Sequence, residues 1–152
     1  MALRISRDLK NYIINQGVIE QMAGTIGTGG SAVINIYTGT QPADADTEPT
    51  GTSGTLLCEI INIGWGGSNG TVGATSGTVC ASSAGGFAGT AVVTGTAGWA
   101  RMRTYGTNSF GSAGTYTIDG EVGTASTCTF VINSVSVTNA QSVTLVTTSL
   151  AL

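Results

Sequence analysis

The chain has 152 residues and a formal net charge of −3, and only 9% of its residues are charged, against about 25% in a typical soluble domain. This length suits one domain with its own hydrophobic core. The acidic balance, with no cluster of Lys and Arg, argues against nucleic acid as a partner, because such binding depends on contacts to phosphates. No apolar run approaches the length of a membrane-spanning helix, so we expect no membrane partner either.

A surface built from Thr, Ser, Asn, Gly and Ala has little charge repulsion to keep copies of the protein apart. Such a surface suits a protein that packs against neighbours, although a solitary secreted β domain could share the composition. The chain starts with MALRISRDLKNYII, in which Arg4, Arg7, Asp8 and Lys10 interrupt any apolar segment. We therefore expect no secretory signal peptide.

Residues 6–22 are predicted to form the one helix of the chain, because Ser6 can cap it and apolar residues follow at helical spacing. These apolar residues cover more than one stripe, which indicates burial on two sides. Their side chains are therefore expected at an inter-subunit contact: Leu9, Ile13, Ile14 and Val18. Residues 25–31 are expected to be a flexible connector, so that 1–31 forms a helical arm and 32–152 a β domain.

Short strands separated by Gly-rich turns are predicted for the rest of the chain. The expected strands are 32–37, 56–65, about 78–81, about 88–94, 97–105, 116–122, a strand carrying Cys128, Phe130 and Ile132 on one face, 135–137 and 143–150, with a long polar loop at 38–54. Because no helix is expected between strands, a parallel α/β sheet is excluded. The predicted fold is mainly β: a single antiparallel β-sandwich, immunoglobulin-like or jelly-roll-like, with one N-terminal helix.

Alternation along the strands assigns side chains to faces. In 56–65, Leu57, Ile61 and Ile63 are expected on one face and Leu56, Cys58 and Ile60 on the other, which predicts burial on both. In 32–37, Ile34 and Ile36 share a face, opposite Val33, Asn35 and Tyr37. In 97–105, Trp99, Arg101 and Arg103 share a face, opposite Ala100 and Met102. Arg101 and Arg103 are expected to lie opposite Asp119 and Glu121 on a paired strand, where opposite charges stabilise the sheet.

Catalysis is not expected, because the chain contains no His. The common general base and the Ser-His and Cys-His nucleophile pairs are therefore absent. Two carboxylate groups could serve a glycosidase, one at Asp44, Asp46 and Glu48 and one at Asp119 and Glu121, but the aromatic platforms of such sites are scarce. The order of the carboxylates in 44–48 does not fit a calcium loop, and no phosphate-binding glycine motif occurs. We predict no catalytic residue, cofactor or metal site.

Three cysteines, Cys58, Cys80 and Cys128, form no CxxC motif. Two interpretations stay open: three small buried side chains in a reducing compartment, or one bond with a leftover thiol or bonds between subunits. Cys58 is expected to be a plain core residue. Cys80 lies beside Gly-rich segments that can approach a neighbour closely, so it is the cysteine expected at an inter-subunit contact.

Three segments also carry a resemblance: INIYTGTQPADADTEPTGTSGTLLCEI (34–60), TGTAGWARMRTYG (94–106) and YTIDGEVGTAS (116–126). In this order they resemble a family of small structural, virion-associated proteins of tailed bacteriophages. The chain departs from that pattern at Ala100, where a bulkier apolar residue is expected, and in its cysteines. The family supplies no catalytic or ligand-binding motif that can be carried over to this chain.

The resemblance implies a virion protein that folds in the host cytoplasm and leaves by lysis, which reconciles the surface composition with the expected lack of an export signal. Its expected partners are other virion proteins, of the capsid or of the neck and tail, and copies of itself. The leading expectation is a decoration or cement subunit that reinforces the capsid. The alternatives are a neck, collar or tail subunit, including a fibre or tail-tip piece, and a module that binds the host surface.

Overall fold

The computed structural model describes residues 32–49, 51, 54–63, 71–75, 78–82, 87–104 and 117–151. The strands in this part of the chain are β1 (Ala32–Tyr37), β2 (Leu56–Ile63), β3 (Thr71–Thr75), β4 (Thr78–Ser82), β5 (Phe87–Thr90), β6 (Gly95–Thr96), β7 (Trp99–Thr104), β8 (Thr117–Gly123), β9 (Phe130–Ile132), β10 (Ser136–Val137) and β11 (Ser142–Ala151). The expected mainly β fold is therefore confirmed. The predicted helix at 6–22, with Leu9, Ile13, Ile14 and Val18, and the connector at 25–31 lie outside the described residues.

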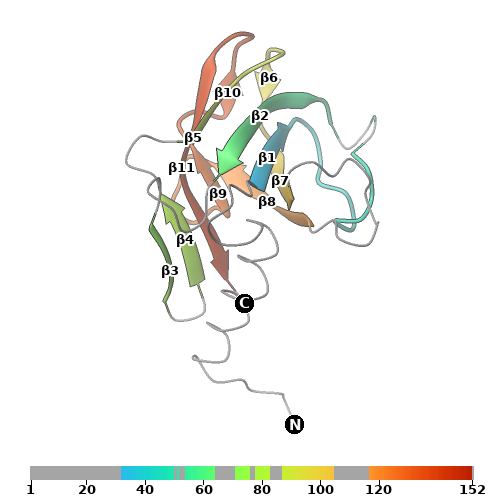
Figure 1. The fold of residues 1–152 in the computed structure, drawn as a ribbon. Helices are drawn as coiled ribbons and strands as arrows, with labels where there is room; N and C mark the ends of the chain where they lie inside the picture. The colour runs from blue at the N-terminus through green and yellow to red at the C-terminus, as the bar shows by residue number, and fades with distance from the viewer. Residues whose placement is uncertain are drawn as a thin grey trace.

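Most of these strands form one continuous sheet, in the order β2-β1-β7-β8-β9-β11-β4-β3, and β5 also pairs with β11 (Figure 1). β5 leads back toward β2, because Cys58 forms a β-bridge with Ala91 and the N–H of Val92 donates to the carbonyl of Leu57 at 2.8 Å. The strands β2, β1, β7, β8, β9, β11 and β5 therefore form a nearly closed ring. β6 and β10 pair separately.

One strand pair differs from the antiparallel arrangement that the sequence predicted. β8 and β9 run parallel, with Val122 opposite Phe130 and Gly123 opposite Val131. Parallel pairs are normally joined by a crossover of a dozen or more residues, whereas only 124–129 separate these two strands. The two strands pair at only two positions, which is consistent with so short a connection between them. The sheet is therefore mixed, and the expectation of an antiparallel sheet throughout is wrong at this junction.

The hydrophobic core fills the inside of the ring. The predicted alternation is confirmed in β1, where Ile34 and Ile36 enter the core, and in β7, where Ala100 and Met102 do. Strands β9 and β11, across the ring, supply further large inward side chains: Phe130, Ile132, Val143 and Leu145. Burying each of these aliphatic or aromatic side chains stabilises the fold by roughly 1.5–3 kcal/mol before the entropy of ordering is counted.

Bulges overturn part of the predicted facing of β2. Ile36 pairs with Cys58 and Tyr37 with Leu56, so Leu57 has no partner across the ladder. Leu57 and its neighbour Cys58 are both fully buried, and Ile61 is 43% exposed. The prediction that Leu57 and Ile61 share a buried face is therefore wrong, because one extra residue in a strand shifts every later side chain to the other face.

Two further features, one in β11 and one at β3, were not predicted from the sequence. The register of β11 shifts between Leu145 and Thr147, and Val146 at this irregularity is 53% exposed. The strand β3 lies in the Gly-rich stretch 64–77, where no strand was predicted. Gly and Thr in this stretch lack the apolar alternation by which a strand is recognised.

Gly89 lets β5 approach β2 closely at the seam of the ring. A Cβ atom at position 89 would collide with the backbone carbonyl oxygen of Glu59 and would lie 2.7 Å from the sulfur of Cys58. The carbonyl belongs to the β2 backbone and cannot move aside as a flexible side chain could. The absence of a side chain at this position is therefore a condition for closing the ring.

Replacing Gly89 with Ala should lower the free energy of unfolding by about 1–3 kcal/mol, the usual cost of overpacking, as measured by chemical denaturation. Thr90→Ala, at the exposed next position of β5, is the matched control and should change stability by less than about 0.5 kcal/mol. Equal stabilities of the two variants would contradict the close packing of β5 on β2.

Candidate functional site

The outer face of β2, β1, β7 and β8 carries a set of charged, polar and aromatic side chains. Glu59, Asn35, Arg101 and Asp119 lie opposite one another on these four strands and form one row across the sheet. In the next row Tyr37 lies opposite Trp99, and Trp99 opposite Glu121. Sequence alternation placed Asn35 and Tyr37 opposite Ile34 and Ile36, and the same face of the sheet carries Trp99 and Arg101, so these side chains point away from the core.

The structure instead buries most of this face. Trp99 is 1% exposed, Tyr37 7% and Arg101 0%. Loop 38–49 is bonded to this face, and the bonds fall at Thr47 and Ala45. The bond to Thr47 places the loop against Arg101, which helps to keep this side chain out of contact with water although it points away from the core.

Arg101 makes the central ion pair of the face. Its Nε and Nη2 donate to the two carboxylate oxygens of Asp119, each at 2.6 Å, and its Nη1 donates to the carbonyl oxygen of Thr47 at 2.7 Å. The Asp119 side chain is only 3% exposed. A guanidinium that meets a carboxylate through two parallel bonds is among the stronger pairings in proteins. The predicted pairing of Arg101 with Asp119 is confirmed.

Arg103 behaves differently from the prediction. It lies opposite Thr117 on β8, and its Nη2 bonds instead to Glu59 on β2 at 3.1 Å. Glu121, the expected partner, lies opposite Trp99 and is exposed. The Glu59 side chain is 42% exposed, so the Arg103–Glu59 pair contributes less to stability than the Arg101–Asp119 pair.

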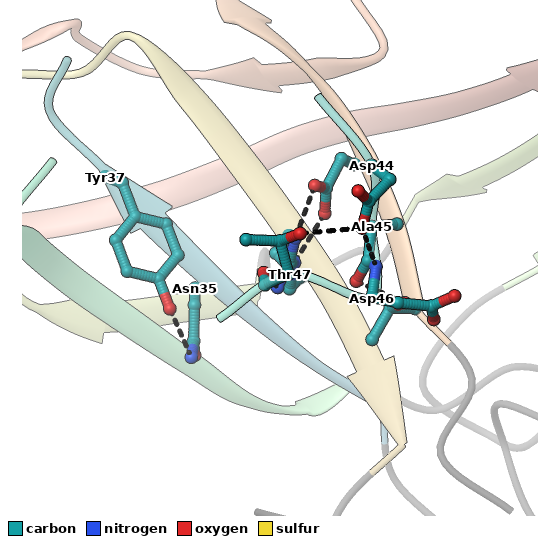
Figure 2. Close-up of polar contacts among 9 residues, drawn as sticks. Asn35, Tyr37, Asp44, Ala45, Asp46 and Thr47 are labelled. Carbon is teal, nitrogen blue, oxygen red and sulfur yellow. Dashed lines mark hydrogen bonds and ion pairs between the residues drawn. The ribbon is translucent and has the colours of Figure 1, made fainter. Parts of the chain in front are cut away.

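An aromatic pair extends the buried face beside Arg101. The rings of Tyr37 and Trp99 stack with centroids 4.6 Å apart and planes 15° apart, and the Arg101 guanidinium lies 5.5 Å from the centre of the Trp99 ring. The amide of Asn35 donates to the Tyr37 hydroxyl at 3.2 Å, as Figure 2 shows. Burial raises the pKa of Tyr37, so this phenol stays protonated in the folded protein. Arg101 thus also contacts a ring at the distance of a cation–π interaction.

Three more hydrogen bonds order loop 38–49, one to β8 and two within the loop itself. The hydroxyl of Thr117 on β8 donates to the carbonyl of Ala45 at 2.9 Å. Within the loop, Asp44 Oδ1 accepts bonds from the N–H of Asp46 at 3.1 Å and from the hydroxyl of Thr47 at 2.8 Å (Figure 2). This is the local turn that Asp commonly forms with the backbone two residues on.

The carboxylates that sequence analysis weighed for catalysis or calcium binding are not drawn together. Asp44, Asp46 and Glu48 are exposed on the loop, and Asp119 is held by Arg101. In the part of the chain that the structure describes, no group of three or more His, Cys, Asp or Glu residues could hold a metal ion. The polar side chains of this face join β7 to β8 and join both strands to loop 38–49.

Sequence reasoning missed the contacts that involve backbone groups. The carbonyls of Thr47 and Ala45 are partners of Arg101 and Thr117, and a carbonyl leaves no trace in the residue types. The stacking of Tyr37 on Trp99 had a weak signal, because both follow the alternation that places them on the outer face. The sequence does not give the register of β1 and β7, and it is this register that places Tyr37 directly opposite Trp99.

The cysteines divide into two described thiols and one that is only partly described. Cys58 and Cys128 are buried and unbridged, which confirms the core interpretation for these two. Burial, with a smaller contribution from the negative charge of Glu59, raises the pKa of the Cys58 thiol to about 11. Cys80 lies on β4, where its backbone pairs with Gly73 and Ser149. Its expected place at a subunit contact stays a prediction.

No protein-family model, curated protein or solved structure matches the chain. Among the residues described, there is also no helix long and apolar enough to cross a membrane. The chemistry of the face must therefore be inferred from its own side chains.

Replacing Arg101 with Met should lower the free energy of unfolding by about 3–5 kcal/mol, because the Asp119 carboxylate would stay buried without a counter-charge. Arg103→Met is the matched control and should cost less than about 1 kcal/mol, since its partner is partly exposed. The double variant Arg101→Met, Asp119→Leu should recover much of the loss, because no unpaired charge remains. Equal losses in the two single Arg variants would contradict a special role for Arg101.

The Cys58 thiol should react slowly with alkylating reagents in the folded protein at pH 8, since its pKa of about 11 keeps it protonated and its side chain is buried. In a Cys80→Ser, Cys128→Ser chain, thiolate absorbance should rise only near pH 11. The raised pKa contributes stability below the ordinary thiol pKa, and this contribution should fade as the pH rises toward 11. Fast alkylation at pH 8 without unfolding would refute this prediction.

Proposed function

We propose that this protein is a non-catalytic structural subunit of a tailed-bacteriophage particle. The supporting observation is that segments 34–60, 94–106 and 116–126, which carry the resemblance to phage structural proteins, meet in one structural unit. Arg101 joins the second segment to Asp119 of the third and to the Thr47 carbonyl of the first. Thr117 joins the third to the Ala45 carbonyl of the first. The residues of these three segments therefore stabilise the fold by bonding to one another, which favours a structural role.

The engagement of the charged groups supports the proposal that the protein is not an enzyme and uses no cofactor. Both carboxylate oxygens of Asp119 accept bonds from Arg101, whose remaining Nη1 is bonded to Thr47. Asp44 Oδ1 is used in its own turn. A general acid or base must reach the proton that it transfers, and Asp119 could do so only by giving up its partner.

The proposed location is the virion, after folding in the host cytoplasm. The low charge of the chain suits a protein that works packed against its neighbours. The proposed partners are capsid or neck and tail subunits and copies of the chain itself. Nucleic acid and membranes are not proposed as partners.

Within the particle we favour decoration of the head, where the subunit would reinforce the capsid lattice. The alternatives are a neck, collar or tail position and a module that recognises the host surface. Carbohydrate recognition commonly uses exposed aromatic rings, whereas Tyr37 and Trp99 are 7% and 1% exposed. This pair therefore offers no open platform for a sugar, which favours the decoration role over the binding module.

We also propose that the domain is a sandwich of two layers. The ring can be divided into two layers, β2-β1-β7-β8 and β9-β11-β5, that meet across the core and are linked by the short β8–β9 pairing. An immunoglobulin-like or jelly-roll-like sandwich with an N-terminal helix at 6–22 would have two such layers. A structure of the assembled subunit would test both the layers and the helix.

Antibodies raised against the purified chain should label intact phage particles of the strain that encodes it, as seen by electron microscopy. Label over the whole head, with a copy number that matches the capsid lattice by quantitative mass spectrometry, is the expected result. Label confined to the neck or tail would favour the alternative position. Purified particles without the protein would refute the proposed function.

A further inference from the structure

The charged side chains of the β domain are confined to one side of the ring. Its carboxylates lie in loop 38–49 and on β2 and β8, and its two arginines lie on β7: Asp44, Asp46, Glu48, Glu59, Asp119, Glu121, Arg101 and Arg103. By contrast, residues 60–98 and 122–152 contain no Asp, Glu, Lys or Arg. The ring order places β11 and β5 across from β1 and β7. Among the residues that the structure describes, one side is therefore acidic and the other carries no charged side chain.

The uncharged side has a continuous outer face on β5 and β11. The core residues Phe87, Val143 and Leu145 alternate with side chains that are exposed or half-buried. We define the uncharged face by these outward residues and the two that follow β5: Ala88, Thr90, Val92, Val93, Ser142, Thr144 and Val146. Thr90 pairs with Ser142 and Ala88 with Thr144, so four of them form two rows.

Apolar exposure is concentrated on the same face. Four large apolar side chains in the described residues are exposed, and three of them are Val92 at 64%, Val146 at 53% and Val93 at 37%. The other members are Ala, Ser and Thr, whose short side chains let two sheets approach to about 10 Å. Cys80 lies on β4, which pairs with the far end of β11 in the same uncharged part of the domain.

We propose that the uncharged face binds a second copy of this chain. The lack of charged side chains on this face favours a second copy as the partner, because two copies can meet here without bringing any carboxylates together. On the acidic side, Asp44, Asp46 and Glu48 of one copy would repel those of another, and like-charge contacts cost several kcal/mol. A positively charged partner protein would instead bind the acidic side. The inference rests on the proposed structural role for its setting and names one partner of that role.

Sedimentation velocity of the full chain at increasing concentration, with reducing agent present, tests the proposal. The wild-type chain should form dimers or larger species, and high salt should not dissociate them, because the face contains no ion pair. Val92→Glu and Thr90→Glu should each raise the dissociation constant by about tenfold or more, since each places a carboxylate in the contact. Thr40→Glu, at an exposed position of loop 38–49, is the matched control and should leave association unchanged.

Two results would overturn the proposal: a wild-type chain that stays monomeric at every concentration, or association that Thr40→Glu weakens as much as Thr90→Glu does. Circular dichroism checks that each variant is folded, and Thr90→Glu decides the outcome if Val92→Glu is not. A monomeric chain that is still found in particles would refute self-association alone. A self-associating chain that is missing from particles would refute the proposed function alone.

Discussion

The buried ion pair between Arg101 and Asp119 is the interaction on which the outer face of β1, β7 and β8 depends. Removing two charges from water is costly, and only good geometry with further hydrogen bonds offsets that cost. Here the guanidinium meets both carboxylate oxygens and gives a third bond to the carbonyl of Thr47. Because Thr47 lies in loop 38–49, the same group that pairs β7 with β8 also holds the loop, and it lies 5.5 Å from the centre of the Trp99 ring. Strand pairing, loop position and the contact with the aromatic pair are thus coupled through one side chain.

This coupling explains how a chain with so few charged residues uses them. Among the described residues, both arginines are in ion pairs and one of them is fully buried. The exposed charged residues in this part of the chain are all acidic and lie in loop 38–49, on β2 and on β8. The opposite side consists of short polar and apolar residues on β5 and β11. A domain with one acidic side and one uncharged side can meet its own copies through the uncharged side, while the acidic side disfavours unordered contacts. That division suits a subunit that must assemble in one orientation.

The sequence was informative where a pattern depends on local alternation. β1 has the predicted bounds, the faces of β1 and β7 follow the period of two, and opposite charges at matching positions predicted the pairing of Arg101 with Asp119. Alternation failed at Leu57, because a bulge in β2 shifts the faces and has no sequence signature in this chain. The bond that holds loop 38–49 against the buried Arg101 could not be predicted either, since its acceptor is the backbone carbonyl of Thr47. The parallel contact of β8 with β9 depends on the path of 124–129, whose residue types give no signature of a parallel connection.

Hydrogen exchange of loop 38–49 in an Arg101→Lys variant tests the central claim most directly. Lysine keeps the positive charge but cannot form two parallel bonds to Asp119 while also reaching Thr47. The backbone amides of 38–49 should therefore exchange much faster than in the wild-type chain, while those of β11, on the far side of the ring, keep their protection. Unchanged exchange in the loop would contradict the account, because the loop would then be held in place without the contacts that only the arginine fork can make.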